Sequence, residues 1–413
     1  MDMTTSKYSV YNEWIVIFLN SYGRFAEKLD SIKNEPNYKL HNNRSKIEMI
    51  KSLAKRIAIS LISLMLGGGM AVTAMADDPI TLRLSMHQAT NSPEKKRIID
   101  PLVEFIESKS DGKIKVEVYA NGTLHGAAEG FKALVTDITD IAPTYPIYQS
   151  RSFDLNHVTN LPLAFPNAYV GVRVTEELYP EYLAAEWEKL GVYPLFYPVT
   201  ATYDLITTKP IVSIADLKGM KIRGGGAALN EIIERMGATP VTIKSPEVYA
   251  AFQQGVVDGL LFNTASILSF RLDEIGKYYI PLGITRVGIA WGYSPKTFAN
   301  LSPELQQVMF EAGREASILY ADYVTEDTDA AIEAMKEKGV TFVELPPEDL
   351  QMVKNAVAPM WAKFIDDNEA EGRPAKALVE ALREKTDKYG AMTREEFVEL
   401  QRTNPVQGLF PNK

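Results

Sequence analysis

Short strand patterns alternate with helix patterns along most of this chain, starting at Ile80. Apolar and polar side chains alternate over residues 80–86 and again over 113–119, and an amphipathic helix pattern over 93–110 separates these two predicted strands. A helix placed between two strands allows the strands to run parallel in one sheet, with the helix packed on a face of that sheet. The order of elements therefore predicts an α/β fold.

A second set of strand and helix patterns begins near residue 192. Strands are predicted over 192–198, 203–208, 239–243 and 259–262, and helices over 228–236 and 246–254. Two comparable sets predict two lobes with a cleft between them. We expect the first lobe to comprise residues 77–203 with a later segment near 290–330, and the second to comprise residues 204–289 with a C-terminal helical portion near 331–410.

A long helix pattern covers residues 301–339, with Pro303 in its first turn. Gly313 lies inside this pattern, and because glycine lowers helix stability we expect the helix to break there. A short strand is predicted from Phe342, and residues 347–388 are again helical with one charged face.

Composition and charge narrow the functional classes. The 413 residues are 46% hydrophobic and 23% charged, which is typical of a folded protein with two domains. The net charge of -9 argues against a nucleic-acid partner, because such a partner requires a basic surface. The chain has no cysteine, which excludes disulfide bonds, thiolate metal sites and a lipid-modified cysteine anchor.

An export signal is predicted within the N-terminal region. Three basic residues between 51 and 56 precede the apolar run 57–66, and small side chains follow up to Ala76. A membrane anchor is the alternative, but the run is about half the ~20 residues needed to cross a bilayer. We therefore expect residues 49–76 to be a signal peptide, residues 1–48 to be an extension outside the mature protein, and the mature protein to reside in an envelope compartment.

Arg223 is the first candidate for a ligand contact. It ends a short predicted strand and is followed by Gly224, Gly225 and Gly226 before a helix begins. A guanidinium group can pair both oxygens of a carboxylate, and the first turn of a helix offers unpaired N–H groups. A structural arginine in a salt bridge is the alternative. Gly224 is a second candidate, because a glycine lets the backbone approach a ligand closely.

Three further residues are candidates for the cleft. His87 follows the first predicted strand, Tyr203 lies on the strand before the Arg223 unit, and Tyr145 lies with Tyr148 in a loop that contains proline. Each could present a polar group to a ligand, and each could instead pack inside the protein.

The usual motifs of catalysis are absent from the sequence. The four histidines are widely spaced, so no metal site is predicted. The sequence has no Gly-x-Ser-x-Gly elbow and no phosphate loop, and the triple glycine lacks the spacing of a dinucleotide fingerprint. We therefore predict no catalytic residue, no metal and no cofactor.

Several ordered segments together resemble one protein family, the extracytoplasmic solute-binding proteins of TRAP (tripartite ATP-independent periplasmic) transporters. The resemblance covers nearly all of the expected mature chain. Its main segments are Asp216-Leu217-Lys218-Gly219-Met220-Lys221-Ile222-Arg223, Met236-Gly237-Ala238-Thr239-Pro240-Val241, Phe252-Gln253-Gln254-Gly255-Val256-Val257-Asp258-Gly259 and Leu161-Pro162-Leu163-Ala164-Phe165.

The resemblance implies two hinged lobes that close on a solute, with a long helix lying across both. It also implies that Arg223 pairs with the carboxylate of the solute. The protein would work in the periplasm and deliver the solute to a permease in the membrane. Many relatives have a polar stretch where this chain has Leu260-Leu261-Phe262-Asn263, so we expect Asn263 to be a polar contact beside an apolar wall. This departure and the triple glycine favour an acid with an apolar or aromatic portion.

Two functional hypotheses follow from the sequence. The preferred one is a periplasmic binding protein that captures a small organic acid and delivers it to integral-membrane TRAP permease subunits. The alternative is an exported α/β enzyme, a lyase or hydrolase, that acts on a similar acid. Recovery of the bound compound, changed or unchanged, distinguishes the two.

Overall fold

The computed structural model describes residues 78–149 and 152–409. The predicted signal peptide, its cleavage point and the preceding extension lie outside these residues. No helix in the described part of the chain is long and apolar enough to cross a membrane.

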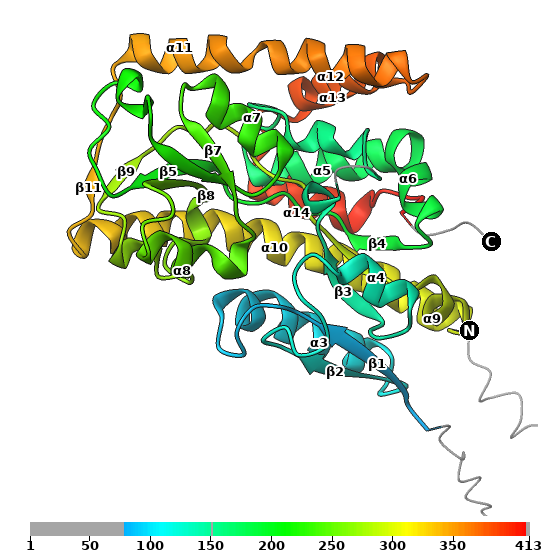
Figure 1. The fold of residues 1–413 in the computed structure, drawn as a ribbon. Coiled ribbons are helices and arrows are strands. Elements are labelled where there is room, and N and C mark those ends of the chain that lie inside the picture. Colours follow the sequence, from blue (N-terminus) through cyan, green and yellow to red (C-terminus); the bar gives the residue numbers. More distant parts are fainter. Residues whose placement is uncertain (1–77, 150–151, 410–413) are drawn as a thin grey trace, which may run out of the picture. The chain divides into compact units, whose positions relative to one another are not determined.

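Two sheets form the framework of residues 78–409 (Figure 1). The first has the strand order β2 (Ile114–Tyr119), β1 (Ile80–Ser85), β3 (Ile141–Thr144), β10 (Ala290–Tyr293) and β4 (Tyr193–Phe196). The second has the order β11 (Thr341–Phe342), β9 (Tyr278–Ile280), β5 (Tyr203–Thr207), β8 (Gly259–Asn263), β6 (Lys221–Gly224) and β7 (Thr239–Thr242). The prediction of an α/β fold is confirmed.

Both sheets are mixed, because each contains parallel strands and one strand that runs antiparallel to its two neighbours. In the first sheet β1 runs parallel to β2 and β3, while β10 is antiparallel to β3 and β4. In the second sheet β6 runs parallel to β7 and β8, while β5 is antiparallel to β8 and β9. We call the part built on the first sheet the first lobe and the part built on the second sheet the second lobe.

Helices follow the strands at nearly every step. Those between strands are η1 (Lys95–Ile99), α3 (Asp100–Lys109), α4 (Gly130–Val135), α5 (Ala168–Leu178), α6 (Ala184–Lys189), α7 (Ala227–Arg235) and α8 (Val248–Gln253). The later helices are α9 (Pro295–Ala299), α10 (Pro303–Glu337), α11 (Pro347–Val357), α12 (Pro359–Ala370), α13 (Ala375–Tyr389) and α14 (Arg394–Thr403). Within the last group α11 packs on α7, whereas α13 and α14 pack on α5. The C-terminal helices therefore contact both lobes, and the predicted residue bounds of the lobes stay a prediction.

The chain crosses between the sheets along residues 197–202, along residues 281–289 and through α10. Asp204 fastens the second of these crossings to β5. Its carboxylate accepts hydrogen bonds from the backbone N–H groups of Leu282 and Gly283, both at 2.7 Å, and from the hydroxyl of Tyr279 at 2.8 Å. A buried carboxylate with this many donors is fully satisfied, so the crossing is held in one position relative to β5.

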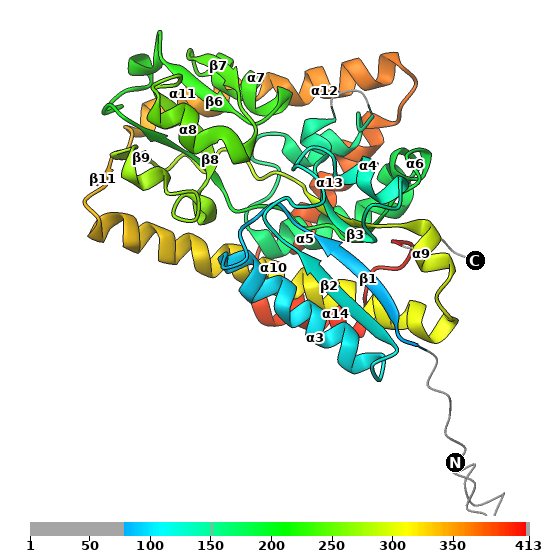
Figure 2. The same cartoon turned by 60° about the horizontal axis from the view of Figure 1, so that its bottom comes forward.

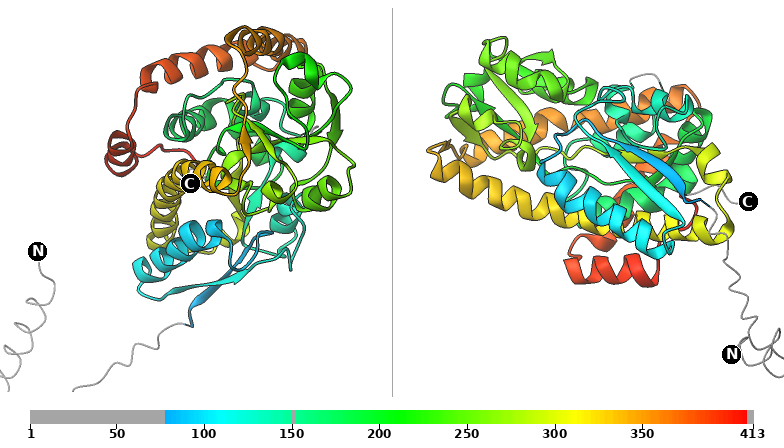
Figure 3. Two further views of the ribbon diagram at one scale, coloured as in Figure 1. Left: turned by 90° about the vertical axis from the view of Figure 1, so that its left-hand side faces the viewer. Right: turned by 90° about the horizontal axis from the view of Figure 1, so that it is seen from below.

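The helix α10 extends along elements of both sheets in Figures 1 and 2. It packs on η1, α3 and β4 of the first lobe, contacts the 3-10 turn after β8 in the second lobe, and leads directly into β11. At 1.5 Å per residue its 35 residues extend about 52 Å. Figure 3 shows α14, the last helix, beside it.

The predicted break at Gly313 is wrong, because α10 is continuous from Pro303 to Glu337. A Cβ atom at position 313 would lie 2.1 Å from the carbonyl oxygen of Leu195 in β4. The glycine therefore serves close packing of the helix on the first sheet and does not interrupt the helix.

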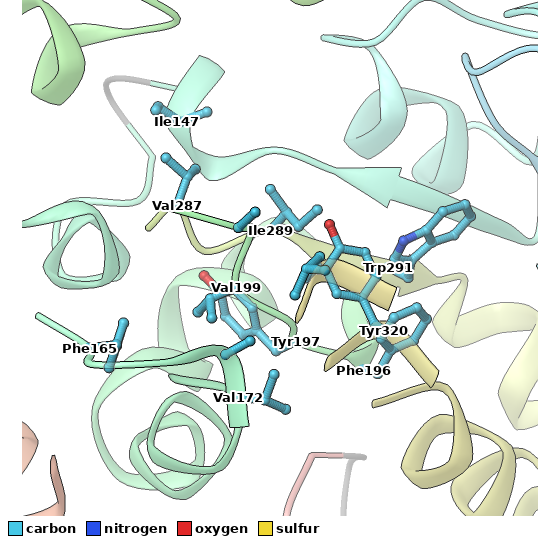
Figure 4. Close-up of a cluster of buried hydrophobic side chains, with 14 of the residues drawn as sticks. Ile147, Phe165, Val172, Phe196, Tyr197, Val199, Val287, Ile289, Trp291 and Tyr320 are labelled. Carbon is cyan, nitrogen blue, oxygen red and sulfur yellow. The ribbon is translucent and has the colours of Figure 1, made fainter. Parts of the chain in front are cut away.

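Figure 4 shows a cluster of buried side chains in which aromatic rings pack among aliphatic side chains. The ring of Trp291 in β10 is fully buried and stacks on Phe196 in β4, with ring centroids 6.0 Å apart and an angle of 7° between the planes. Phe165 is also buried. Both rings therefore pack in the interior of the protein.

We expect Gly313→Ala to destabilise the protein by about 1 to 3 kcal/mol, because overpacking against a backbone carbonyl outweighs the roughly 1 kcal/mol gain in helix propensity. Urea denaturation measures this change, with the exposed Gln307→Ala on the same helix as the control. A Gly313→Ala protein as stable as the wild type would contradict the packing argument.

Candidate ligand-binding site

A small cavity lies between the two lobes, with a volume of about 70 Å³. Its walls come from the loop after β1, the turn after β3, the end of β8 and one face of α10. Its lining residues include His87, Gln88, Glu94, Tyr145, Tyr148, Ser245, Phe262, Asn263, Phe270, Tyr320 and Tyr323. Polar and aromatic side chains thus meet where the carboxyl ends of strands from both sheets approach each other, which is the usual place for a ligand in an α/β protein.

Arg223 lies behind the second-lobe wall of this cavity and is 1% exposed. Its Nε donates to the carbonyl oxygen of Ile243 at 2.7 Å, and Nη2 donates to the hydroxyl of Ser245, a lining residue, at 3.4 Å. The guanidinium carbon also lies 5.0 Å from the centre of the Phe262 ring. The Nε–H group is therefore held by a short bond, while the terminal nitrogens reach the Leu261 carbonyl at 3.5 Å and the Ser245 hydroxyl at 3.4 Å.

The charge of Arg223 has no carboxylate partner among the described residues. Two other buried arginines provide a comparison, because Arg314 pairs with Glu176 at 2.7 Å and Arg173 pairs with Glu177 at 2.8 Å. Burial lowers the pKa of the Arg223 guanidinium, yet an arginine keeps its charge in proteins. An unpaired buried cation is costly, so the site favours an anion that supplies the missing charge.

Two tyrosines stand next to the guanidinium of Arg223. Tyr148 and Tyr203 both interact with it, and burial raises the pKa of Tyr203, so this phenol stays neutral. The Tyr148 hydroxyl also lies 3.3 Å from Ser245 Oγ, which joins a first-lobe turn to a second-lobe turn. Tyr203 is directly opposite Asn263 in the pairing of β5 with β8, and their side chains interact.

The three glycines after Arg223 make room for protein atoms. A Cβ atom at Gly224 would lie 2.0 Å from Asn230 Oδ1, and one at Gly225 would lie 3.1 Å from Nη2 of Arg223 itself. A Cβ atom at Gly226 would lie 2.5 Å from the carbonyl oxygen of Ile147, which belongs to the first lobe. The glycines therefore shape the corner around Arg223 and allow the lobes to approach each other.

Glu94 is the only charged side chain that lines the cavity among the described residues. Its Oε2 accepts a hydrogen bond from the amide of Gln88, and burial raises the pKa of its carboxyl group to about 7. Burial and the neighbouring His125 lower the pKa of His87 to about 4, so His87 is neutral near pH 7. The first-lobe side of the cavity therefore contains an acid that is partly ionised at neutral pH.

A second, larger cavity adjoins the first. Its volume is about 380 Å³, and it shares His87, Gln88 and Phe270 with the inner cavity. The inner volume alone is smaller than the roughly 150 Å³ of an engineered cavity that holds benzene. A ligand with a ring therefore requires both cavities, or a small separation of the lobes.

The structure brings most of the predicted site residues together. His87, Tyr145 and Asn263 line the cavity, and Arg223 and Tyr203 lie directly behind it. Gly224 is not among the lining residues. Their role in ligand binding stays a prediction. The described residues contain no cluster of side chains suited to a metal ion.

Sequence reasoning missed several cavity residues. In the sequence Glu94 resembles an ordinary acidic residue in the first turn of a helix. Tyr320 and Tyr323 fall at apolar positions in the helix pattern of α10, which is typical of core residues. Ser245 begins a short 3-10 turn and Phe270 lies in a loop, and neither belongs to a motif. The short spacing of Glu94 from His87 was the one available signal, because both follow the carboxyl end of β1.

A model of the bacterial extracellular solute-binding proteins, family 7, matches residues 84–368. The chain belongs to this family. The family consists of solute receptors, and the predictions of a TRAP-type solute-binding protein and of no enzymatic activity are confirmed.

Named relatives and solved structures agree with this family. The C4-dicarboxylate-binding periplasmic protein DctP of Rhodobacter capsulatus is 24% identical over 77% of this chain and 96% of its own length. A TRAP solute-binding protein of Rhodoferax ferrireducens, solved with copurified benzoate, has a TM-score of 0.72 and 20% identity over 76% of this chain and 99% of its own. A TRAP solute-binding protein of Bordetella bronchiseptica, solved with bound mandelate, has a TM-score of 0.69 and 23% identity. The match covers 75% of this chain and 99% of that protein.

We expect the buried carboxyl of Glu94 to lower stability at neutral and alkaline pH. A pKa raised from 4.5 to about 7 in the folded state costs about 3 kcal/mol once the pH exceeds both values, and costs nothing below about pH 4.5. Glu94→Gln should therefore stabilise the protein by up to about 3 kcal/mol at pH 8, and this gain should shrink as the pH falls from 7 to 4.5.

Urea denaturation at several pH values measures this gain. The exposed Glu104→Gln on α3 is the control and should show no such trend. A gain from Glu94→Gln that is equal at pH 4.5 and pH 8 would show that the Glu94 carboxyl is not held in a buried, charge-disfavouring position.

Proposed function

We propose that this chain is the periplasmic solute-binding subunit of a TRAP transporter and that it captures an organic acid between its lobes. The observation that most supports this function is Arg223, a buried guanidinium without a carboxylate partner in the described part of the chain. The carboxylate of the ligand would supply that partner through two parallel charge-assisted hydrogen bonds. Asn263 and the hydroxyls of Tyr203 and Tyr148 would assist at the same end of the ligand.

The walls of the cavity favour an acid with an aromatic or apolar portion. Aromatic rings of both lobes face the cavity, including Tyr145, Phe262 and Tyr320. Rings of this kind bury a flat ligand and stack on it. The structural neighbours solved with benzoate and with mandelate, both aromatic acids, agree with this ligand class.

Capture would involve a hinge motion of the two lobes. The inner cavity is too small for a ring and adjoins a larger outer cavity, so the lobes would separate to admit the ligand and close behind it. The segments that cross between the sheets would carry this rotation, with residues 281–289 anchored to β5 at Leu282 and Gly283 through Asp204. The closed form would then be recognised by integral-membrane permease subunits, as the TRAP family implies, and the ligand would be released without chemical change.

We expect Arg223→Met to abolish binding of carboxylates while the protein stays folded, because methionine fills the space without the charge or the donors. Ligand-induced thermal stabilisation across a carboxylate library measures this loss. A ligand at 100 times its Kd stabilises the wild type by about 2.7 kcal/mol, which is readily detected. The surface Arg271→Met, whose arginine pairs with the exposed Glu274, is the control and should respond like the wild type. An Arg223→Met protein that still binds acids would remove Arg223 from the site.

We expect Gly226→Ala to weaken ligand binding by about 10-fold or more, because its methyl group would press on the Ile147 carbonyl of the other lobe and oppose closure. Gly126→Ala is the control, since its methyl group meets only the mobile end of the Glu129 side chain. Isothermal titration of both variants with one bound acid measures the effect. Equal affinities would show that the lobes do not need this close approach.

A further inference from the structure

Glu94 is a second ionisable group at the cavity, and it comes from the first lobe, whereas Arg223 comes from the second. Glu94 belongs to the helical turn that follows β1 of the first lobe, whereas Arg223 is the next-to-last residue of β6 in the second lobe. No ion pair joins the two residues among the salt bridges of the described chain. The cavity therefore has one unpaired cation behind its second-lobe wall and one acid in its first-lobe wall.

The first-lobe wall also contains hydrogen-bond acceptors that have no donor. Oε1 of Glu94 and Oε1 of Gln88 are both buried and make no hydrogen bond. A buried acceptor without a donor destabilises the protein, because it has lost its hydrogen bonds to water. Two such oxygens on one wall match a ligand group with several N–H donors.

No basic side chain of the described protein neutralises Glu94. The neighbouring Lys95 is paired with Asp100, and Arg97 is paired with Glu326 and Asp327 on α10. The other titratable groups that face Glu94 are uncharged near pH 7: His87 from the loop after β1, Tyr145 from the loop after β3, and Tyr320 and Tyr323 from α10. A cation that pairs with Glu94 must therefore arrive with the ligand.

Aromatic rings connect the two charged ends of the site. The Tyr145 ring lies 5.5 Å from that of His87 and 5.4 Å from that of Tyr148, which in turn interacts with Arg223. Tyr320 and Tyr323, 6.0 Å apart, add two more rings near Glu94. Aromatic faces attract cations as well as apolar groups, so this wall also suits a ligand with a cationic nitrogen.

We propose, building on the function proposed above, that the ligand is a zwitterion whose carboxylate pairs with Arg223 and whose cationic nitrogen binds Glu94 and the amide oxygen of Gln88. Each buried charge of the site then has an opposite charge in the bound state, and both unsatisfied oxygens gain donors. A plain organic acid would satisfy only the arginine. An acid with a hydroxyl group would supply one donor and no charge.

The test compares matched pairs of acids by isothermal titration. The probes are the ω-amino acids from 3-aminopropanoate to 6-aminohexanoate and 3-(aminomethyl)benzoate, each with the isostere in which a methyl group replaces the ammonium. We expect at least one amino acid to bind the wild type about 10- to 100-fold more tightly than its isostere, as a charged hydrogen-bonded pair provides. Glu94→Gln should bring that ratio close to one, whereas the exposed Glu104→Gln should leave it unchanged.

The outcomes separate this proposal from the proposed function. Acids that bind through Arg223, with amines no tighter than their isosteres or a ratio that Glu94→Gln does not change, would overturn the zwitterion alone. Binding that Arg223→Met does not affect, or no binding by any probe of either kind, would overturn both. The stability measurements on Glu94→Gln establish that this variant is folded before it is titrated.

Discussion

The charge of Arg223 is the constraint on which the rest of the site depends. A guanidinium that is almost completely removed from water requires an anion, and the other buried arginines, Arg173 and Arg314, obtain theirs from the protein. At Arg223 the described protein supplies two backbone carbonyls, a serine hydroxyl, phenols and the face of the Phe262 ring, but no carboxylate. The unpaired charge therefore costs stability in the absence of an anion, and under the proposed function the carboxylate of a bound acid would recover that stability.

The architecture makes this recovery dependent on both lobes. Arg223 and Asn263 lie at the carboxyl ends of strands of the second sheet, while Tyr145, Tyr148 and Glu94 come from the first lobe. A ligand that touches both sets would hold the lobes together. The crossing segment fixed by Asp204 and the long helix α10 connect the two lobes, so the closure that we propose would be a hinge rotation about them. Binding energy would in this way be converted into a closed shape that a membrane partner could recognise.

The fold could be predicted from sequence where residues have local signals. Alternation over 113–119 identified β2, and the segment before Arg223 identified β6 together with the charge that it presents. The continuity of α10 could not be predicted, because the reason for a glycine at position 313 is its close contact with the Leu195 carbonyl, and Leu195 belongs to a strand that is distant in the sequence. Glu94 was missed for a similar reason. Its burial and its lack of a basic partner depend on the three-dimensional fold and cannot be inferred from the sequence.

The most direct test of the account is a crystal structure of the protein with an acid bound. We expect both carboxylate oxygens to lie within about 3 Å of Arg223 nitrogens, with Tyr148, Tyr203 or Asn263 as further donors. An acid bound elsewhere, with Arg223 still unpaired behind the cavity wall, would contradict it.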